Sequence, residues 1–479
     1  MQDNKQSGNS NRGALTVLTF LFFFWGFLTV LNDILIPYLK KIFELTYFEV
    51  MFVQFAFFGA YFIGSLVYFL ISIRAGDPIT KIGYKNGILA GLLISATAAF
   101  LFYPAAALHI FPLFLIALFV LGLGFTLLQI SANPYVAILG PEKTASSRLN
   151  LAQAFNSLGT TIGPIVGGWL IFSFFGSRGK PLLDVAGKII KTDDGQTMSA
   201  LGVQMPYLIF AAGLLLLFAI VRFTKLPVFV NTETVPKDAG ALKHKNLSYG
   251  ILAIFFYVGA EVAIGSLMIS FFKLPQIAGM GETTAKSFLA FYWGGAMIGR
   301  FLGSISLSDK KTSLPKPLLM LFTAVITFLV IWYVVNLTGT ISFGDVWPFL
   351  IFIGLNYAAF MAGGSDAART LSIFAAIVIA LLLTVVFFNG HIAMWCLIGI
   401  GLFNSIMWSN IFTLAIKGLG KYTSQGSSLL VMAILGGAII PLIQGKLADV
   451  FGLHLSFLLP VISYIYLFWY GLKGSKTDF

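Results

Sequence analysis

Two acidic residues lie deep inside long apolar stretches of the chain. Asp33 falls late in the stretch 14–38 and Glu261 falls in the stretch 247–272, whereas the other sixteen of the eighteen acidic residues lie in connections, termini or stretch ends. A charge inside a bilayer is costly and is therefore functional by default. A carboxyl group in a low-dielectric cavity can load and release a proton, so we predict that at least one of these residues is a cation-coupling site.

Other roles for the two carboxylates stay open. Asp33 is also placed to cap a broken helix end near Pro37, and Glu261 to pair permanently with an arginine or an amide. Sodium competes with the proton as the coupling ion, because carboxylate, amide and backbone oxygens suit hard cations as well. Of the two ions we favour the proton.

Amide and indole side chains in the apolar stretches predict a site for a sugar. Sugar recognition needs polar partners for the ring hydroxyls and an aromatic face for the apolar side of the ring. Gln129 and Asn133 are four apart and Gln153 and Asn156 three apart, so each pair shares a helix face. The alternative is that the amides join helices and the indoles pack or face lipid. The candidates are Gln129, Asn133, Gln153, Asn156, Asn404, Trp25, Trp293 and Trp408.

The remaining reactive side chains argue against metal or redox chemistry. Arg300 follows Gly299 at the end of an apolar stretch, where we expect a gate or a phosphate-level anchor rather than a ligand contact. The single cysteine, Cys396, excludes a disulfide framework. The four histidines lie near stretch ends or connections without paired spacing, so we expect no metal site and no cofactor: His109, His244, His391 and His454.

The elements that position these residues are membrane-spanning helices. The chain is 58% hydrophobic and only 10% charged, which excludes a soluble globular protein. Runs apolar on every side argue against a β-barrel, whose strands alternate in polarity. A span needs about 20 apolar residues. We predict an all-α membrane protein with fourteen spans at about 14–38, 49–72, 86–105, 109–138, 149–174, 203–223, 247–272, 284–307, 317–337, 345–364, 370–388, 392–416, 425–446 and 452–472.

An internal repeat organises the spans. Gly59 and Gly64 match Gly294 and Gly299, 235 residues later. Further on, six Gly, Asn and Pro residues between positions 122 and 168 match residues 277 positions later. The two offsets differ by 42 residues, about two membrane crossings. We therefore predict a six-helix bundle at 1–223, a cytoplasmic linker at 224–246, and a second bundle at 247–479 that includes two inserted helices at about 317–364.

The distribution of basic residues predicts the orientation. With the N-terminus in the cytoplasm, twenty Lys and Arg fall in inside connections and nine in outside connections. This bias places both termini in the cytoplasm. The basic residues are scattered through short connections, so the formal charge of +12 is a topology signal and gives no reason to expect a nucleic-acid partner.

Several longer strings resemble a known family. Two parallel six-helix halves are the architecture of the major facilitator superfamily. The strings NDILIP at 32–37, SANPY at 131–135, RLNLAQAFNSLG at 148–159, FNSIM at 403–407 and QGSSLLVMAI at 425–434 resemble its fucose/glucose–galactose symporter family, with the glucose/galactose branch the more similar. Two positions depart from the family: Thr80 stands where an acidic signature residue is expected, and the position of Gln129 resembles one that holds a protonatable Glu in the fucose branch.

The resemblance implies a secondary active transporter that carries a hexose such as glucose or galactose with a cation by alternating access. The expected setting is a bacterial inner membrane, with a monomer embedded in the lipid bilayer. A uniporter, or a carrier of fucose, of an N-acetylated hexosamine or of another small polar solute, is the alternative within transport. A membrane receptor that has lost transport is the alternative from another class. We expect no enzyme activity, because an enzyme would need a nucleophile and a base, or a metal site, at depth, and the histidines are wrongly placed for either.

Overall fold

The computed structural model describes residues 2–45, 49, 52–183, 187–191, 197–227, 237–309, 314–336 and 341–476. Within these ranges the side chains of residues 2–12, 32–34, 37, 54, 164, 165, 173, 282 and 283 are outside the description. Asp33 is among them, so the side chain of this predicted coupling residue lies outside the described residues. The chain divides into two compact units, Met1–Tyr135 with Leu158–Asp238, and Val136–Ser157 with Ala239–Phe479.

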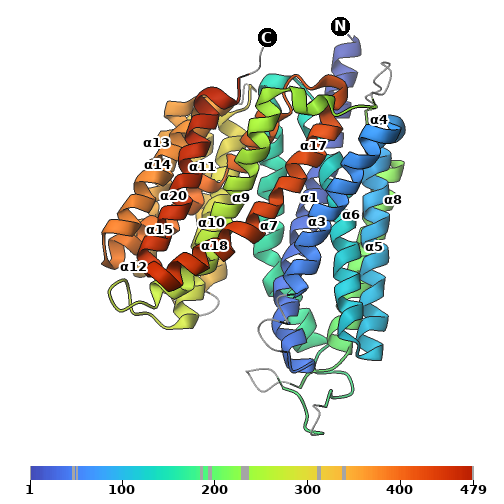
Figure 1. Cartoon of the computed structure of the whole chain (residues 1–479), viewed down its shortest axis with the longest axis vertical. Coiled ribbons are helices and arrows are strands. Elements are labelled where there is room, and N and C mark those ends of the chain that lie inside the picture. The colour runs from blue at the N-terminus through green and yellow to red at the C-terminus, as the bar shows by residue number, and fades with distance from the viewer. Residues whose placement is uncertain are drawn as a thin grey trace. The chain divides into compact units, whose positions relative to one another are not determined.

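Apolar runs form the long helices of the first unit, because inside a membrane the backbone N–H and C=O groups find partners only within the helix. Its elements run side by side in Figure 1 and are α1 (Gln2–Ile42), α3 (Phe52–Ala75), the short α4 (Pro78–Ile82), α5 (Tyr84–Leu108), α6 (Phe111–Ile138) and α8 (Leu201–Phe223). Helix α7 (Ala145–Gly168) continues into a π-helical turn, Trp169–Phe174, and its residues are divided between the two units.

The second unit holds more helices, several of them interrupted. They are α9 (Lys245–Phe272), α10 (Glu282–Ser306), α11 (Lys316–Asn336), α12 (Phe343–Val346), α13 (Pro348–Gly363), α14 (Ala367–Phe387), α15 (Gly390–Asn404), α16 (Met407–Ala415), α17 (Thr423–Met432), α18 (Gly436–Phe451), α19 (Leu453–Ser456) and α20 (Leu458–Trp469). A capping box between Ser342 and Asp345 starts α12, and hydrogen bonds from Ser342 lower the pKa of the Asp345 carboxyl.

The all-helical prediction is confirmed, whereas the count of fourteen spans is not. Among the described residues, eleven helices are long and apolar enough to cross a membrane. Helices α7, α10 and α13 are not among them. With 16 residues, α13 is about 24 Å long, shorter than a hydrocarbon core of about 30 Å. The predicted count, and the predicted bundle and linker boundaries, stay predictions.

The repeat reappears in the packing of each unit. A Cβ added to Gly159 of α7 would collide with the carbonyl oxygen of Phe23, and one added to Gly436 of α18 would collide with that of Phe255. These glycines are 277 positions apart, so matched glycines let matched backbones approach closely. In the first unit α5 packs along α8, and in the second α14 packs along α20.

Helices α11 and α13 add to this arrangement in the second unit. Helix α11 packs against α10 and α13, and α13 contacts α10, α14 and α15. One face of α13 is buried, whereas Leu350, Ile351, Leu355 and Met361 on its other face are exposed. The pair therefore covers α10 and α15 on one side and presents an apolar surface on the other.

Candidate functional site

Glu261 is the predicted coupling residue whose side chain the structure describes. It belongs to a hydrogen-bonded cluster. It is half-buried on α9, and the hydroxyl of Tyr257, one turn earlier on the same helix, donates to its Oε1 at 2.8 Å. The same hydroxyl lies 3.1 Å from the backbone oxygen of Asn404 on α15. The hydroxyl of Tyr292 on α10 donates to the backbone oxygen of Glu261 at 3.1 Å. Helices α9, α10 and α15 thus meet around Tyr257 and the backbone of Glu261.

Asn404 is the centre of the cluster. Its side chain is fully buried, its Nδ2 donates to the Tyr292 hydroxyl at 2.9 Å, and its Oδ1 accepts from the Tyr464 hydroxyl at 2.6 Å. Both polar atoms of the amide therefore have protein partners. Such fully satisfied buried networks make a packing arrangement unique. In this structure Asn404, predicted to bind sugar, joins α10, α15 and α20, and its predicted role stays a proposal.

The chain breaks its helix directly after Asn404. Helix α15 ends at Asn404 and α16 begins at Met407, and a break frees backbone carbonyl groups that must find other partners in a membrane. Asn356 Nδ2 donates to Leu402 O at 3.0 Å, Tyr257 donates to Asn404 O, and Arg300 Nε donates to Ser405 O at 3.1 Å. Side chains from α13, α9 and α10 thus hold three backbone carbonyl groups at the break.

Arg300 connects the break to the carboxylate. Besides Ser405 O, its guanidinium donates through Nη1 to the Ser157 hydroxyl on α7, within the same unit. It also acts electrostatically on Glu261 and Tyr257. The Arg300 guanidinium therefore lies within electrostatic reach of the Glu261 carboxylate while it holds Ser405 O. The structure brings Glu261, Asn404 and Arg300 together in one cluster.

A second cluster lies in the first unit. Tyr61 of α3 is buried, and its hydroxyl hydrogen-bonds with the side chains of Gln129 on α6 and Trp25 on α1. The Trp25 ring packs against Phe22 and Phe125 at centroid distances of 5.3 and 6.4 Å. Gln129 and Trp25 are thus joined through one buried tyrosine hydroxyl.

Asn133 lies one turn beyond Gln129 on α6 and differs from it in its partners. Its side chain is fully buried, and within the described part of the chain neither Nδ2 nor Oδ1 has a hydrogen-bond partner. A buried amide without partners costs about 1–3 kcal/mol. Asn133 therefore has the polar capacity to bind a ligand hydroxyl or water.

The other predicted residues occupy varied surroundings. Gln153 is buried and Asn156 half-buried on α7. The Trp408 ring stacks on Phe412, and its buried Nε1 has no partner within the described residues. Trp293 is 42% exposed beside the ring of Tyr292. Their predicted sugar contacts stay untested by this geometry.

Residue-type reasoning missed the tyrosines of both clusters. Tyr257 precedes Glu261 by four residues, so a helical reading alone places the two side chains on one face. Tyr61, Tyr292 and Tyr464 have no such local signal, because their partners lie on other helices. Among the described residues, no group of three or more His, Cys, Asp or Glu is arranged to hold a metal ion.

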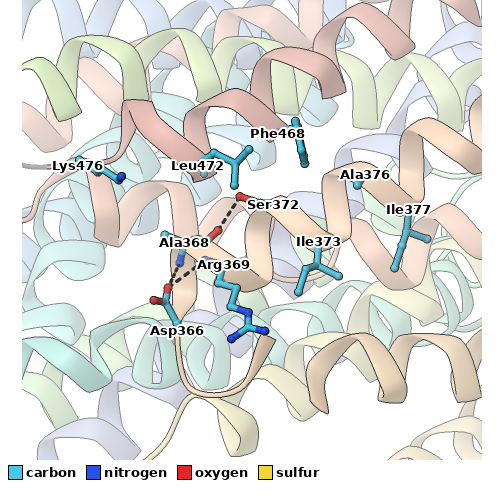
Figure 2. A pocket seen from close by; sticks show the side chains of 11 residues that line it. Asp366, Ala368, Arg369, Ser372, Ile373, Ala376, Ile377, Phe468, Leu472 and Lys476 are labelled. Carbon is cyan, nitrogen blue, oxygen red and sulfur yellow. Dashed lines mark hydrogen bonds between the residues drawn. The ribbon is translucent and has the colours of Figure 1, made fainter. Parts of the chain in front are cut away.

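Figure 2 shows a groove elsewhere in the second unit, between α14 and α20. Ile373, Ile377 and Phe468 line its apolar part, and Arg369 and Lys476 lie at its polar end. The Asp366 carboxylate there caps α14 by accepting from the backbone nitrogens of Ala368 and Arg369. None of the predicted site residues lines this groove, so it is not a candidate for their ligand.

Comparison with known proteins adds to this geometry. The sequence profile of the Major Facilitator Superfamily matches residues 16–371. A glucose/galactose transporter of Brucella abortus is 42% identical over 475 residues, covering 98% of this chain and 96% of that protein. The L-fucose-proton symporter of Escherichia coli is 31% identical over 485 residues, covering 99% and 96%. A crystal structure of FucP in the outward conformation matches with a TM-score of 0.73 at 29% identity, covering 98% of this chain and 100% of that chain.

Proposed function

Since the chain belongs to the Major Facilitator Superfamily, we propose that it is a secondary active sugar transporter that moves a hexose such as glucose or galactose together with a proton. The family resemblance stated from the sequence is confirmed. The observation that carries the proposal is the similarity to a glucose/galactose transporter along nearly the whole chain. The similarity to a fucose-proton symporter supports proton coupling and makes fucose the second candidate sugar.

The coupling residues in this proposal are Glu261 in the second unit and Asp33 in the first. Glu261 receives a hydrogen bond from Tyr257 and the electrostatic influence of Arg300, so the carboxylate has both a proton-sharing neighbour and a cation that responds to its charge. Protonation of Glu261 weakens the attraction of Arg300, which frees the guanidinium to move with the backbone at Ser405. In this way proton loading is linked to the position of the helix break.

The sugar residues in this proposal are the amides and indoles that the sequence predicts. Asn133 has two polar atoms without partners in the described part of the chain, and Gln129, one turn away, hydrogen-bonds with the Tyr61 hydroxyl, as does Trp25. Gln153 and Asn156 on α7, together with Trp293 and Trp408, complete the proposed set. Asn404 contributes through its tyrosine partners, because both of its own polar atoms are engaged.

The proposed architecture is two six-helix bundles with one inserted helix pair, fourteen spans in all. The equivalent packing of α5 with α8 and of α14 with α20 supports it, because α14 then corresponds to α5 and leaves α11 and α13 as the extra pair. We also propose a monomer in a bacterial inner membrane. The charge bias of the connections supports placing both termini in the cytoplasm.

Transport in proteoliposomes tests the function. Labelled glucose, galactose and fucose are offered separately under an imposed proton gradient, a sodium gradient or neither. We expect concentrative hexose uptake that follows the proton gradient and is lost in Asp33→Asn or Glu261→Gln. Uptake that ignores both gradients and both substitutions would show a uniporter. No uptake of any sugar would overturn the proposal and favour another solute or a receptor.

A further inference from the structure

We infer that Asn356 of α13 is a positioning residue, which holds the break between α15 and α16 and through it the cluster around Glu261. The inference rests on the proposed function, since Glu261 is there the coupling residue. It gives a use to the helix pair α11 and α13, which the internal repeat predicts to be inserted.

Asn356 is an unusual residue for its position. Apart from its neighbour Tyr357, every residue of α13 is apolar, glycine or proline. Its side chain is completely buried on the face that packs against the rest of the unit. A buried amide in a membrane helix lowers stability unless it finds a partner. Its Nδ2 donates to Leu402 O at 3.0 Å, two residues before α15 ends.

The surrounding contacts fix the height of α13 against α15. A Cβ added to Gly399 would collide with the ring of Phe352, so the glycine lets α13 approach α15 one turn before Leu402. Phe349 is fully buried, and its ring packs against Phe291 of α10 at a centroid distance of 5.4 Å. Asn356 therefore reaches Leu402 from a rigid, closely packed helix face.

The bond acts at a sensitive point of the backbone. Leu402 O also accepts the Ser405 hydroxyl at 2.7 Å, so this one oxygen receives a donor from within the break as well as one from α13. Two residues on, Asn404 O accepts the Tyr257 hydroxyl that also donates to Glu261. A shift of the backbone at Leu402 thus moves an acceptor that competes with the Glu261 carboxylate for one hydroxyl.

The amide is only half used in this conformation. Within the described residues, Asn356 Oδ1 is buried and has no hydrogen-bond partner. An acceptor left unpaired in one conformation favours any other in which a backbone N–H at the break turns toward it. The Asn356 amide can therefore hold the break through its Nδ2 in this conformation and lose that bond at low cost when the backbone moves.

A cysteine of the chain can report whether the Asn356 hydrogen bond holds α15 in place. Cys396 is the single cysteine, and it is buried on α15 six residues before Leu402. Labelling of purified protein in detergent with N-ethylmaleimide, followed by intact mass spectrometry, measures how often α15 opens. Asn356→Leu removes the donor at similar volume, and Tyr357→Phe is the matched control on the same helix.

We expect Asn356→Leu to accelerate Cys396 labelling about fivefold, the change that loss of one hydrogen bond of about 1 kcal/mol produces, with Tyr357→Phe unchanged. Labelling of Asn356→Leu at the wild-type rate would overturn the inference. If Asn356→Leu fails to fold, Gly399→Ala replaces it, because the added methyl group pushes Phe352 and α13 away from α15. An unchanged rate in that variant overturns the inference equally.

Transport separates positioning from a general structural role. In proteoliposomes, Asn356→Leu is expected to lower proton-driven accumulation of hexose about fivefold and to shift its pH profile, while hexose exchange without a gradient keeps its KM. Equal losses in exchange and in driven uptake would show a structural role only. Wild-type protein that accumulates no sugar overturns the proposed function, and the labelling result then still decides whether Asn356 holds the break.

Discussion

Helix α6 of the first unit and the pair α15 and α16 of the second are equivalents in the internal repeat, yet they use the same residue type in opposite ways. Asn133 on α6 and Asn410 on α16 are 277 positions apart, and both are fully buried. Neither polar atom of Asn133 has a partner within the described residues. Asn410 donates to Ala367 O at 3.1 Å and accepts from Asn150 Nδ2 at 3.2 Å.

The helices around the two amides differ in the same sense. Helix α6 runs without interruption from Phe111 to Ile138, although Pro134 lies within it. Its counterpart stops at Asn404 and resumes at Met407, with side chains from three helices on the freed carbonyls. The buried amide of Asn133 thus stays without a partner among the described residues of the first unit, whereas its counterpart in the second unit belongs to a helix pair that is held at its break beside a carboxylate.

The largest expected effect concerns the carboxylate. Glu261→Gln keeps an acceptor for Tyr257 but cannot bind and release a proton. We expect hexose accumulation under a proton gradient to be lost, with sugar equal on both sides, while exchange without a gradient continues. The measurement is labelled hexose uptake in proteoliposomes. Full accumulation by this variant would break the comparison, since coupling would then not need the second unit's carboxylate.

Asn133→Leu is expected to have the next largest effect. If its amide binds a sugar hydroxyl, the loss of that bond raises KM about tenfold, which corresponds to about 1.4 kcal/mol. Stability should not fall, because the substitution removes a buried amide that has no partner among the described residues. KM for hexose and thermal unfolding in detergent are measured together. A lower melting temperature with an unchanged KM would mean that Asn133 serves the protein and not the ligand.

Asn410→Leu is the matched experiment in the second unit. Here we expect stability to fall and KM for hexose to stay unchanged, the reverse of the result expected for Asn133→Leu. The substitution leaves Ala367 O and the Asn150 amide without their partner, so we expect a loss of about 1–3 kcal/mol in the free energy of unfolding. KM for hexose should stay at its wild-type value. A raised KM with unaltered stability would contradict the division of roles between the two units.

Much of the fold could be predicted because apolar length alone defines a membrane helix. The predicted span 86–105 corresponds to α5 (Tyr84–Leu108), and 203–223 to α8 (Leu201–Phe223). The break after Asn404 could not be predicted, since FNSIM contains neither proline nor glycine to announce it. Whether a buried amide has hydrogen-bond partners depends on tyrosines and carbonyl groups from distant parts of the chain. Residue type alone therefore predicted the same sugar-binding role for Asn133 and Asn404.

The smallest expected effect is on stability, and it differs between two glycines of α18 that both belong to the repeat. Gly445 on α18, like its counterpart Gly168, has no heavy atom within 4 Å of the position that an added methyl group would take, and neither has a positive φ. Gly445→Ala should therefore stabilise its helix by about 0.5–1 kcal/mol through reduced backbone entropy of the unfolded chain. Gly436→Ala must displace the backbone at Phe255 and should destabilise instead. Thermal unfolding of both variants decides, because a loss at Gly445 as well would mean that another helix closes on α18 there.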